Sequence, residues 1–505
     1  MTSVALTWST NRIAERLRAW AQAHPGRLVA LGLLLFATAW LPELAWTSLA
    51  PPGDNLEQLT WIHSIEGGYY KHPPLATWLF WLPAQLFGVT AWATYLTGAA
   101  CTLGSIALLW HLLTELRGQR RAALAVLAVL CITYYNGRLH FYNHNVALMP
   151  FVAASALLCW RACATRSLGA WAALGLVVGL GSLVKYQMAV AVACVLVYWL
   201  VRRGWRDERQ RQGLLLALLV ALLVFAPHVR WLEAHDFAPI HYAMDSSLGL
   251  QLGLQARSAD SLQWLLDQLA NRAVPAWLLL GVAWHTVKRR GSGAASPPEP
   301  APTDGSRALL LVWGLVPLLF TTLVGLLFGA DLQLEWGTSF LLFAVPAAME
   351  ALPGVPWVRV PLRPVLITFA ALQFVLLSVN VATSPRGPRL ARDDHWRGFD
   401  SARLARLLQA PARRALGGPI CVVSGPPLPA GALALALDDH PRVLIDGRFD
   451  RSPWISRQRV EACGLLELAE DAPLPGGRPV GPAFPRLSWR IVPPRLRDPS
   501  VADWP

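Results

Sequence analysis

Charged residues are scarce in this sequence. Only 15% of the 505 residues are Asp, Glu, Lys or Arg, whereas 54% are hydrophobic and the mean hydropathy is +0.39. Because soluble domains carry about a quarter charged residues, this composition excludes an ordinary soluble protein and favours one that is largely embedded in a membrane. The 24 tryptophans agree with this class, since indole rings favour the membrane–water interface.

Cysteine is sparse as well, and the seven cysteines show no spacing typical of metal ligands. Five of them lie in apolar segments, where we expect inert buried thiols. Cys421 and Cys463 occur in a polar region, and two interpretations remain open for them: a disulfide in an oxidising compartment, or two unpaired buried thiols. The sequence also lacks a Gly-rich phosphate loop, and its basic, Ala-rich start predicts no cleavable signal peptide.

Apolar runs that predict membrane spans recur along the first 384 residues. The first run follows Arg12, Arg16, Arg18 and Arg27, which place the N-terminus in the cytoplasm by the positive-inside rule. The eleven predicted spans are 28–48, 90–113, 122–137, 146–162, 168–184, 187–201, 213–229, 273–287, 308–328, 338–353 and 362–381.

Positive charge alternates between successive loops. Arginines fill the loops predicted to be cytoplasmic, such as 117–121 and 202–211, while the opposite loops hold only scattered cations. This alternation supports an odd number of spans, and it explains the formal charge of +13 by topology rather than by nucleic-acid binding. A Pro/Ala/Ser-rich stretch at 291–306 is typical of a flexible linker.

The character of the chain changes near residue 385. The tail begins with a charged segment and continues with short apolar runs between Gly/Pro turns, a pattern typical of a small α/β domain. We therefore predict two domains, a transmembrane domain at 1–384 and a soluble domain at 385–505 on the outer side of the membrane.

Polar and aromatic residues at the span edges gather in loops that this topology places on one outer face. Ionisable groups pressed against membrane spans indicate function more often than ordinary loop solvation does. The sequence therefore predicts one outward-facing site. Its segments are the first to fifth outer loops, which lie in order at 51–81, 136–145, 184–187, 227–237 and 330–337.

Asp54 is the candidate catalytic base of this site. It follows a Pro-Pro-Gly that ends the first span, so its carboxylate can face an interfacial cavity and take a proton from a hydroxyl group. The alternative is that Asp54 caps a short helix that begins near Asn55. For Glu57 and Glu66 we expect ordinary surface positions on a short interfacial helix.

Cations from several of these segments predict a phosphate-bearing ligand. A lysine on a flexible stem is a common phosphate contact, although Lys71 and His72 could instead extend toward water. Lys185 follows a long apolar run, where a charge is costly unless it is paired or hydrated. The predicted phosphate contacts are Tyr70, Lys71, His72, Lys185, Tyr186 and Arg230.

In their order, these motifs resemble the bacterial glycosyltransferase family 39 proteins, which are related to protein mannosyltransferases and to the aminoarabinose transferase of lipid A. The resemblance covers residues from about 28 to 465 and implies a GT-C fold, in which membrane helices carry catalytic outer loops and interfacial helices. It also implies a sugar donor linked through phosphate to a polyprenyl lipid. The matching pieces are GDNLEQLTW, GYYKHPPLATWL, FYNHNVALMP, GLGSLVKYQMA, PHVRWLEAHDF and SPW.

The resemblance implies roles for three residues. Asp54 matches the family's catalytic acidic residue, His72 the cation before Pro-Pro, and Lys185 a phosphate contact. Lys71 departs from the pattern, because many relatives carry there an acidic residue that helps to bind a divalent metal. Lys71 supplies a positive charge instead, so we assign no residue to a metal; a divalent metal stays an open alternative, and no other cofactor is expected.

A second departure lies in the loop at 136–145, where many relatives carry an acidic residue and this chain has asparagines. An amide can hydrogen-bond to sugar hydroxyls but cannot act as a base, which leaves Asp54 as the stronger base candidate. The predicted sugar or acceptor contacts are Asn143, Asn145, His228 and Glu335.

The predicted function is transfer of a sugar from a polyprenyl-phosphate donor to a hydroxyl of a lipid, glycan or protein. The reaction is expected to invert the anomeric centre and to occur on the periplasmic face of a bacterial inner membrane, where the C-terminal domain would also lie. The alternatives are a flippase or transporter of lipid-linked sugars and a non-catalytic lipid-binding relative. Transporters usually show internal repeats and charged sites at the bilayer midplane, and neither is evident in this sequence.

Overall fold

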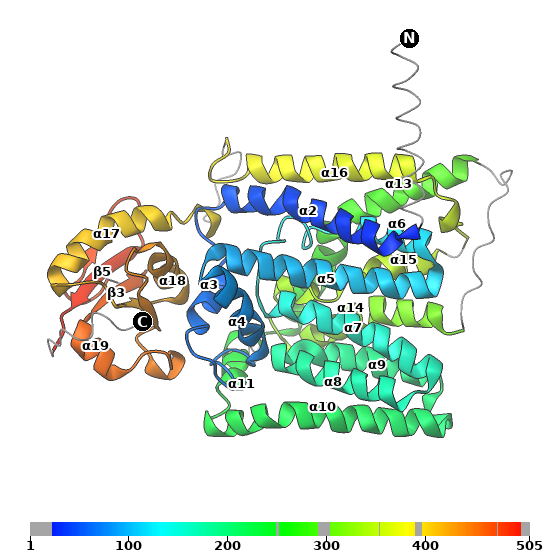
Figure 1. Ribbon diagram of the computed structural model, residues 1–505, viewed down its shortest axis with the longest axis horizontal. Coiled ribbons are helices and arrows are strands. Elements are labelled where there is room, and N and C mark those ends of the chain that lie inside the picture. The colour runs from blue at the N-terminus through cyan, green and yellow to red at the C-terminus, as the bar shows by residue number, and fades with distance from the viewer. Residues whose placement is uncertain are drawn as a thin grey trace, which may run out of the picture.

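The computed structural model describes residues 23–248, 252–290, 304–352, 354–388, 396–471 and 473–495. Arg12, Arg16 and Arg18, and most of the linker predicted at 291–306, lie outside these residues. The described chain forms a bundle of helices with a smaller unit, built around a β-sheet, at one end of the bundle (Figure 1).

Six helices in the described residues are long and apolar enough to cross a membrane. The chain is therefore a multi-pass membrane protein. These helices are α2 (Pro25–Thr47), α5 (Ala91–Arg117), α7 (His144–Thr165), α10 (Glu208–Ala234), α14 (Ser306–Phe328) and α16 (Leu362–Ala382). The shorter helices beside them are α3 (Gly53–Trp61), α4 (Leu75–Phe87), α6 (Gln119–Val129), α8 (Leu168–Val184), α9 (Ala189–Val201), α11 (Ala238–Ala243), α12 (Leu254–Leu266), α13 (Val274–Arg290) and α15 (Ala344–Ala351).

The mostly helical architecture is confirmed, but the number of eleven spans is not. Each predicted span contains a helix, and 168–184 coincides with α8, yet several of these helices are short. The span expected at 122–137 is the clearest difference, because α6 ends at Val129 and turns follow. The hydroxyl of Tyr135 there donates to the backbone oxygen of Thr338, just past the fifth outer loop, which holds the chain in a turn.

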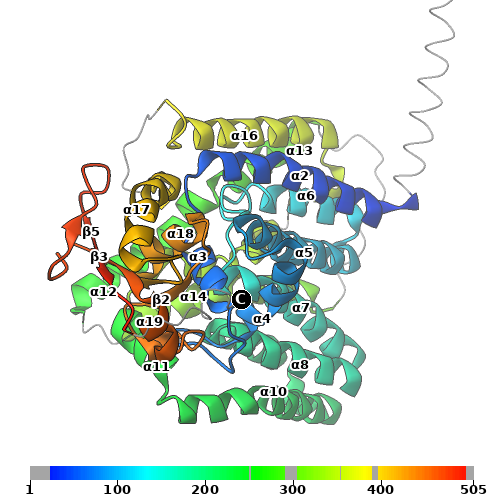
Figure 2. The same ribbon diagram turned by 60° about the vertical axis from the view of Figure 1, so that its left-hand side comes forward.

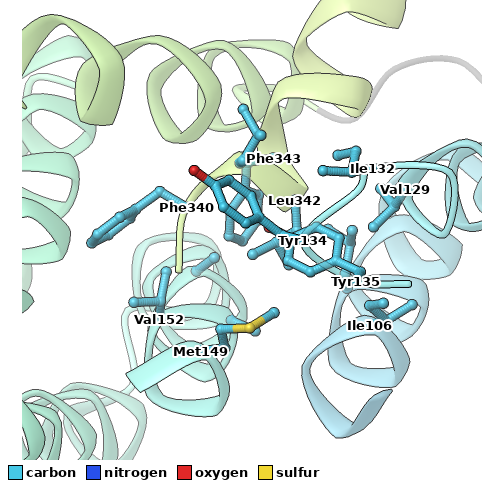
Figure 3. Packing of buried hydrophobic residues seen from close by; sticks show 14 of the residues in the cluster. Ile106, Val129, Ile132, Tyr134, Tyr135, Met149, Val152, Phe340, Leu342 and Phe343 are labelled. Atoms are coloured by element: carbon cyan, nitrogen blue, oxygen red, sulfur yellow. The ribbon is translucent and has the colours of Figure 1, made fainter. Parts of the chain in front are cut away.

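The turn after α6 is packed tightly into the bundle. Figure 3 shows Tyr134 and Tyr135 among side chains from several helices, with Ile106 from α5, Met149 from α7 and Phe343 from the segment before α15. Tyr135 is fully buried. The apolar residues that predicted a helix at 130–137 thus supply core contacts from a non-helical backbone.

A buried ion cluster fastens the end of the bundle that lies away from the sheet unit. The guanidinium of Arg117, at the end of α5, donates two hydrogen bonds to the Glu350 carboxylate at 2.8 and 3.0 Å. Arg121 donates a third at 2.7 Å, and Arg117 also donates to Ser306 Oγ at 2.6 Å. The cluster therefore joins four helices, α5, α6, α14 and α15.

We predict that Glu350→Ala lowers the free energy of unfolding by about 3–5 kcal/mol, because it leaves two buried guanidinium groups without their carboxylate. Thermal or denaturant unfolding of the purified protein in detergent measures the effect. Glu208→Ala is the control, since Glu208 is an exposed residue of α10, and a change of only about 0.5 kcal/mol is expected there. Equal stability of the two variants would contradict the structural role of the cluster.

The C-terminal unit contains one five-stranded sheet, which confirms the small α/β character of the tail. The strand order is β2-β1-β3-β5-β4, with β1 parallel to both β2 and β3 and the remaining pairs antiparallel. The strands are β1 (Val422–Gly425), β2 (Arg442–Ile445), β3 (Leu465–Glu470), β4 (Arg478–Pro479) and β5 (Leu487–Val492). The helices of this unit are α17 (Ser401–Leu416), α18 (Pro427–Ala436) and α19 (Arg457–Cys463).

The sheet unit is docked on the first outer loop of the bundle. Helix α18 packs against α3, and a Cβ atom added to Gly431 would lie 3.4 Å from Leu56 Cβ (Figures 1 and 2). Trp61 and Tyr69 of the first outer loop belong to the same apolar cluster as Leu433 of the sheet unit. Burial of these rings fixes the sheet unit relative to the outer loops. The domain boundary near 385 stays a prediction.

The two cysteines of the sheet unit lie close together. Cys421 precedes β1 and Cys463 ends α19, and both are free thiols. Burial raises the pKa of Cys421 to about 12, and the adjacent Cys463 thiol makes a smaller contribution in the same direction. The sequence left open either a disulfide or two unpaired thiols, and the structure contains the two unpaired thiols.

Candidate functional site

Helix α3 is held in place by the buried side chain of Asn55. Its amide nitrogen donates to Thr94 Oγ1 at 2.8 Å and to the backbone oxygen of His140 at 2.9 Å. Its oxygen accepts from the backbone N–H of Tyr142 at 2.9 Å. Asn55 therefore ties the first outer loop to α5 and to the second outer loop. This role of Asn55 was not predicted from the sequence, although a polar residue on the buried side of a short interfacial helix is a signal for it.

Asp54 lies in the first turn of α3 with its side chain exposed. Its Oδ2 accepts a hydrogen bond from Asn143 Nδ2 at 2.8 Å. The helix starts at Gly53 after Pro52 without a side-chain cap, so Asp54 is not the helix cap that the alternative interpretation expected. Asn143 Oδ1 accepts from the N–H of Val146 at 2.9 Å and caps α7, which fixes the amide that orients Asp54.

Lys71 forms an ion pair with Glu57, one turn along α3 from Asp54. Both side chains are mostly buried, at 17% and 11% exposed, so the expected surface position of Glu57 is wrong. Burial opposes protonation of Lys71, but Glu57 outweighs it and raises the pKa of Lys71 above its ordinary value. The Lys71 ammonium also lies 5.5 and 5.1 Å from the ring centres of Tyr70 and Tyr242. Its charge is thus largely neutralised within the protein.

His72 packs against a second histidine that the sequence analysis did not select. The ring centres of His72 and His144 are 3.9 Å apart, and the indole of Trp61 lies 5.7 Å from that of His144. Burial, His144 and Lys185 together hold the pKa of His72 well below its usual value. His72 is therefore neutral at pH 7 and can offer a hydrogen bond rather than the permanent charge expected from its motif. His144 lies between two predicted site residues, and that position was a signal for it.

Lys185 lies at the junction between α8 and a short 3₁₀ turn (Tyr186–Met188). Its ammonium donates to Asn145 Oδ1 at 2.5 Å and lies 5.8 Å from the centre of the Trp336 ring. Burial lowers the pKa of Lys185 to about 8, although Asp54 and Glu335 act in the opposite direction. In the described part of the chain, no carboxylate forms an ion pair with Lys185. It is therefore a cation whose direct hydrogen-bond partner is neutral.

Tyr186 and His228 connect the third outer loop to the first. The hydroxyl of Tyr186 lies 2.9 Å from His228 Nε2, and His228 Nδ1 lies 2.8 Å from the backbone oxygen of Gly67. A carbonyl oxygen only accepts, so Nδ1 carries the proton and Nε2 accepts from the tyrosine. His228 is buried in this link and helps to position the loops, and its contact with a sugar or acceptor stays a prediction.

Glu335 and Arg230, the two remaining predicted contacts, differ in their surroundings. Arg138 forms an ion pair with Glu335; burial opposes ionisation of Glu335, but Arg138 outweighs it and lowers the pKa of that carboxyl group. Arg230 lies on the exposed face of α10, and no contact in the described residues joins it to the other predicted site residues. The structure therefore does not bring Arg230 into the cluster.

The predicted residues that do converge come from the first three outer loops and the ends of α3, α7 and α8. Asp54, His72, Asn143, Asn145 and Lys185 are joined directly or through His144, as described above. Within the described ranges, no three His, Cys, Asp or Glu side chains lie together as metal ligands. We assign no residue to a metal.

The helix bundle, its outer loops and the appended sheet unit have the GT-C fold. The chain superposes on ArnT from Cupriavidus metallidurans bound to undecaprenyl phosphate with a TM-score of 0.61 and 14% identity, over 92% of this chain and 97% of that one. Residues 71–231 match the family described as dolichyl-phosphate-mannose-protein mannosyltransferase.

Two similar proteins are glycosyltransferases by name. The lipid A galacturonosyltransferase RgtD of Rhizobium johnstonii is 26% identical over 242 residues, which are 46% of this chain and 48% of that protein. The undecaprenyl phosphate-alpha-4-amino-4-deoxy-L-arabinose arabinosyl transferase of Pectobacterium carotovorum is 26% identical over 318 residues, 57% of this chain and 53% of that protein. The alignments thus span about half the length of these relatives. The resemblance expected from the sequence motifs, to the GT-C membrane glycosyltransferases, is confirmed.

We predict that Asn55→Ala lowers the free energy of unfolding by about 3 kcal/mol, because each buried group left without its partner costs about 1–3 kcal/mol. Unfolding of the purified protein in detergent measures this loss. Asn271→Ala is the control, because Asn271 is exposed and its side chain bonds to Asp267 one turn away. If Asn55→Ala is as stable as this control, the anchoring role of Asn55 is wrong.

Proposed function

We propose that this protein transfers a sugar from a polyprenyl-phosphate donor to a hydroxyl group of a lipid acceptor. One observation carries the proposal. Asn143 holds Asp54 and Asn145 holds Lys185, so a single turn at the start of α7 brings a carboxylate close to a cation that has no ion-pair partner among the described residues. Transfer from a phosphate-linked sugar needs this pair of groups, one to take a proton and one to stabilise a leaving phosphate.

In the proposed reaction, the acceptor oxygen attacks the anomeric carbon from the face opposite to the phosphate. The bond between the anomeric carbon and the phosphate oxygen breaks as the new C–O bond forms, so the anomeric configuration inverts. Asp54 takes the hydroxyl proton, and the polyprenyl phosphate departs with the bonding electrons. Lys185 stabilises the negative charge that develops on this phosphate, and neutral His72 donates a hydrogen bond to the phosphate.

The names of the similar proteins support the donor and acceptor classes. The solved ArnT has undecaprenyl phosphate bound, and the Pectobacterium relative is named for an undecaprenyl-phosphate-linked arabinose. RgtD is named for lipid A, which supports a lipid acceptor. The specific sugar is left open by these names, since one relative transfers a galacturonosyl and the other an arabinosyl group.

The proposed orientation places the sheet unit in the periplasm and the N-terminus in the cytoplasm. The arginine-rich end of the bundle, with Arg117, Arg121, Arg202 and Arg206, lies away from the sheet unit and supports this direction. The residues 385–505 would then form a periplasmic domain over the outer loops.

We expect Asp54→Asn to reduce sugar transfer by about 10²-fold or more, because the amide keeps a hydrogen bond to Asn143 but cannot take a proton. The measurement follows release of a radiolabelled sugar from undecaprenyl phosphate by purified protein, with a bacterial membrane extract as acceptor. Asp260→Asn, on the exposed surface of α12, is the matched control and should retain wild-type turnover. Donor binding should be unchanged in both variants.

Two results would contradict this function. Wild-type protein that binds the donor but never consumes it would favour a flippase or a lipid-binding protein. Full activity of Asp54→Asn would show that another group takes the proton.

The pH dependence of donor use should reflect the protonation state of Lys185. Because burial lowers its pKa to about 8, Lys185 is charged at pH 7 and loses its proton as the pH rises through about 8. We therefore expect kcat/KM for the donor to fall above pH 8, since this ratio reports ionisation of the free enzyme. Lys185→Arg should remove this fall, because arginine stays charged. An unchanged alkaline limb in Lys185→Arg would exclude Lys185 as its cause.

A further inference from the structure

Arg451 of the sheet unit reaches into the first outer loop. It ends a 3₁₀ turn (Phe449–Arg451) that follows β2, and its guanidinium carbon lies 5.0 Å from the centre of the Tyr70 ring. The Lys71 ammonium lies 5.5 Å from the centre of the same ring. Two cations, one from the bundle and one from the sheet unit, therefore meet at one tyrosine next to the proposed active site.

The position of Arg451 is fixed by the packing of the sheet unit. Trp61 and Tyr69 share an apolar core with α18 and the strands, and Tyr70 packs against that core. Helix α18 follows β1 and contacts α3, while the Arg451 turn follows β2, so the carboxyl ends of two parallel strands face the first outer loop. In open α/β sheets, ligands bind in the crevice outside the carboxyl ends of the strands.

The side chain of Arg451 has unused capacity to donate hydrogen bonds. Its Nη1 donates to Asp446 Oδ2 at 2.6 Å, and no other hydrogen bond from the guanidinium occurs in the described residues. A guanidinium has five N–H donors in a planar fork that matches a phosphate or a carboxylate. The side chain is 28% exposed, compared with 17% for Lys71, which is already paired with Glu57. Arg451 is thus the more available of the two cations at Tyr70.

Two chains of contacts lead from α3 to two different cations, Lys185 and Arg451. Asp54 faces Lys185 through the Asn143 and Asn145 turn. One turn further along α3, Glu57 leads through Lys71 and Tyr70 to Arg451. In the proposed reaction, the phosphate departs toward Lys185 and the attacking hydroxyl lies near Asp54. The side of the site that faces the sheet unit is then available for the rest of the acceptor.

We propose that Arg451 binds an anionic group, a phosphate or a carboxylate, on the acceptor, and that the sheet unit thereby selects acidic acceptors. The inference rests on the proposed function, because it takes the Lys185 side to hold the donor phosphate. Arg451 exchanges its single bond to Asp446 for a two-pronged contact with the acceptor anion.

The test measures binding of bisphosphorylated lipid A to the full-length protein in detergent, without donor. Undecaprenyl phosphate is measured in parallel, so that a phosphate of the donor is distinguished from one of the acceptor. A third arm uses lipid A whose phosphates have been removed. The variants are Arg451→Ala, Arg451→Lys and Asp446→Asn, with Arg448→Ala as the matched control, because Arg448 lies in the same loop and pairs with the exposed Asp450.

We expect Arg451→Ala to weaken lipid A binding about ten-fold or more, as loss of charge-assisted hydrogen bonds predicts, and Arg451→Lys to weaken it less. Asp446→Asn should tighten binding, because it removes the competing carboxylate; asparagine tolerates the positive φ of 50° at this position. Removal of the phosphates should weaken wild-type binding to the level of Arg451→Ala. Arg448→Ala should bind like the wild type, and all variants should bind undecaprenyl phosphate equally.

Several results would overturn the proposal. Equal binding of lipid A before and after removal of its phosphates, or no binding at all, would exclude an anion contact. Weaker lipid A binding in Asp446→Asn would assign the ion pair a structural role only. Loss of undecaprenyl phosphate binding in Arg451→Ala would place the donor there instead. Failure of the proposed function is distinguishable, because it would appear as absent turnover by the wild type whatever the binding results.

Discussion

The site depends on a buried amide. Asn55 connects α3 to α5 and to the second outer loop through three hydrogen bonds, and this fixes where the neighbouring Asp54 can lie. A buried polar group must be satisfied, so α3 has few alternative positions. The sheet unit covers α3 from the other side through α18, so the two parts of the protein hold the same nine-residue helix.

Charge pairing then decides which groups remain available to a substrate. Lys71 is neutralised by Glu57, Glu335 by Arg138, and His72 is kept uncharged by burial and nearby cations. Lys185 differs, because its hydrogen-bond partner is the neutral amide of Asn145. A cation of this kind attracts a phosphate more strongly than one that already has a carboxylate partner. The functional proposal rests on this difference rather than on the number of basic residues.

The sequence predicted the class of fold and the face on which the polar residues gather, because hydropathy and loop charge depend on local composition. The end of α6 could not be predicted, since the turn at Tyr135 depends on a contact with a loop some two hundred residues away. The same holds for the site. Asp54 and Lys185 carry recognisable motifs, but the pairing of Lys71 and the position of Arg451 arise only when distant segments meet. Arg230 was selected from its place at the end of a span, and the helical phase of α10 turns it outward.

A cryo-electron microscopy structure with undecaprenyl phosphate would test the central claim most directly. The account predicts phosphate density within hydrogen-bonding distance of the Lys185 ammonium, with the Asp54 carboxylate still bonded to Asn143 and free to face an acceptor. Density for the phosphate beside Arg230, or at the Arg117 and Arg121 end of the bundle, would contradict it.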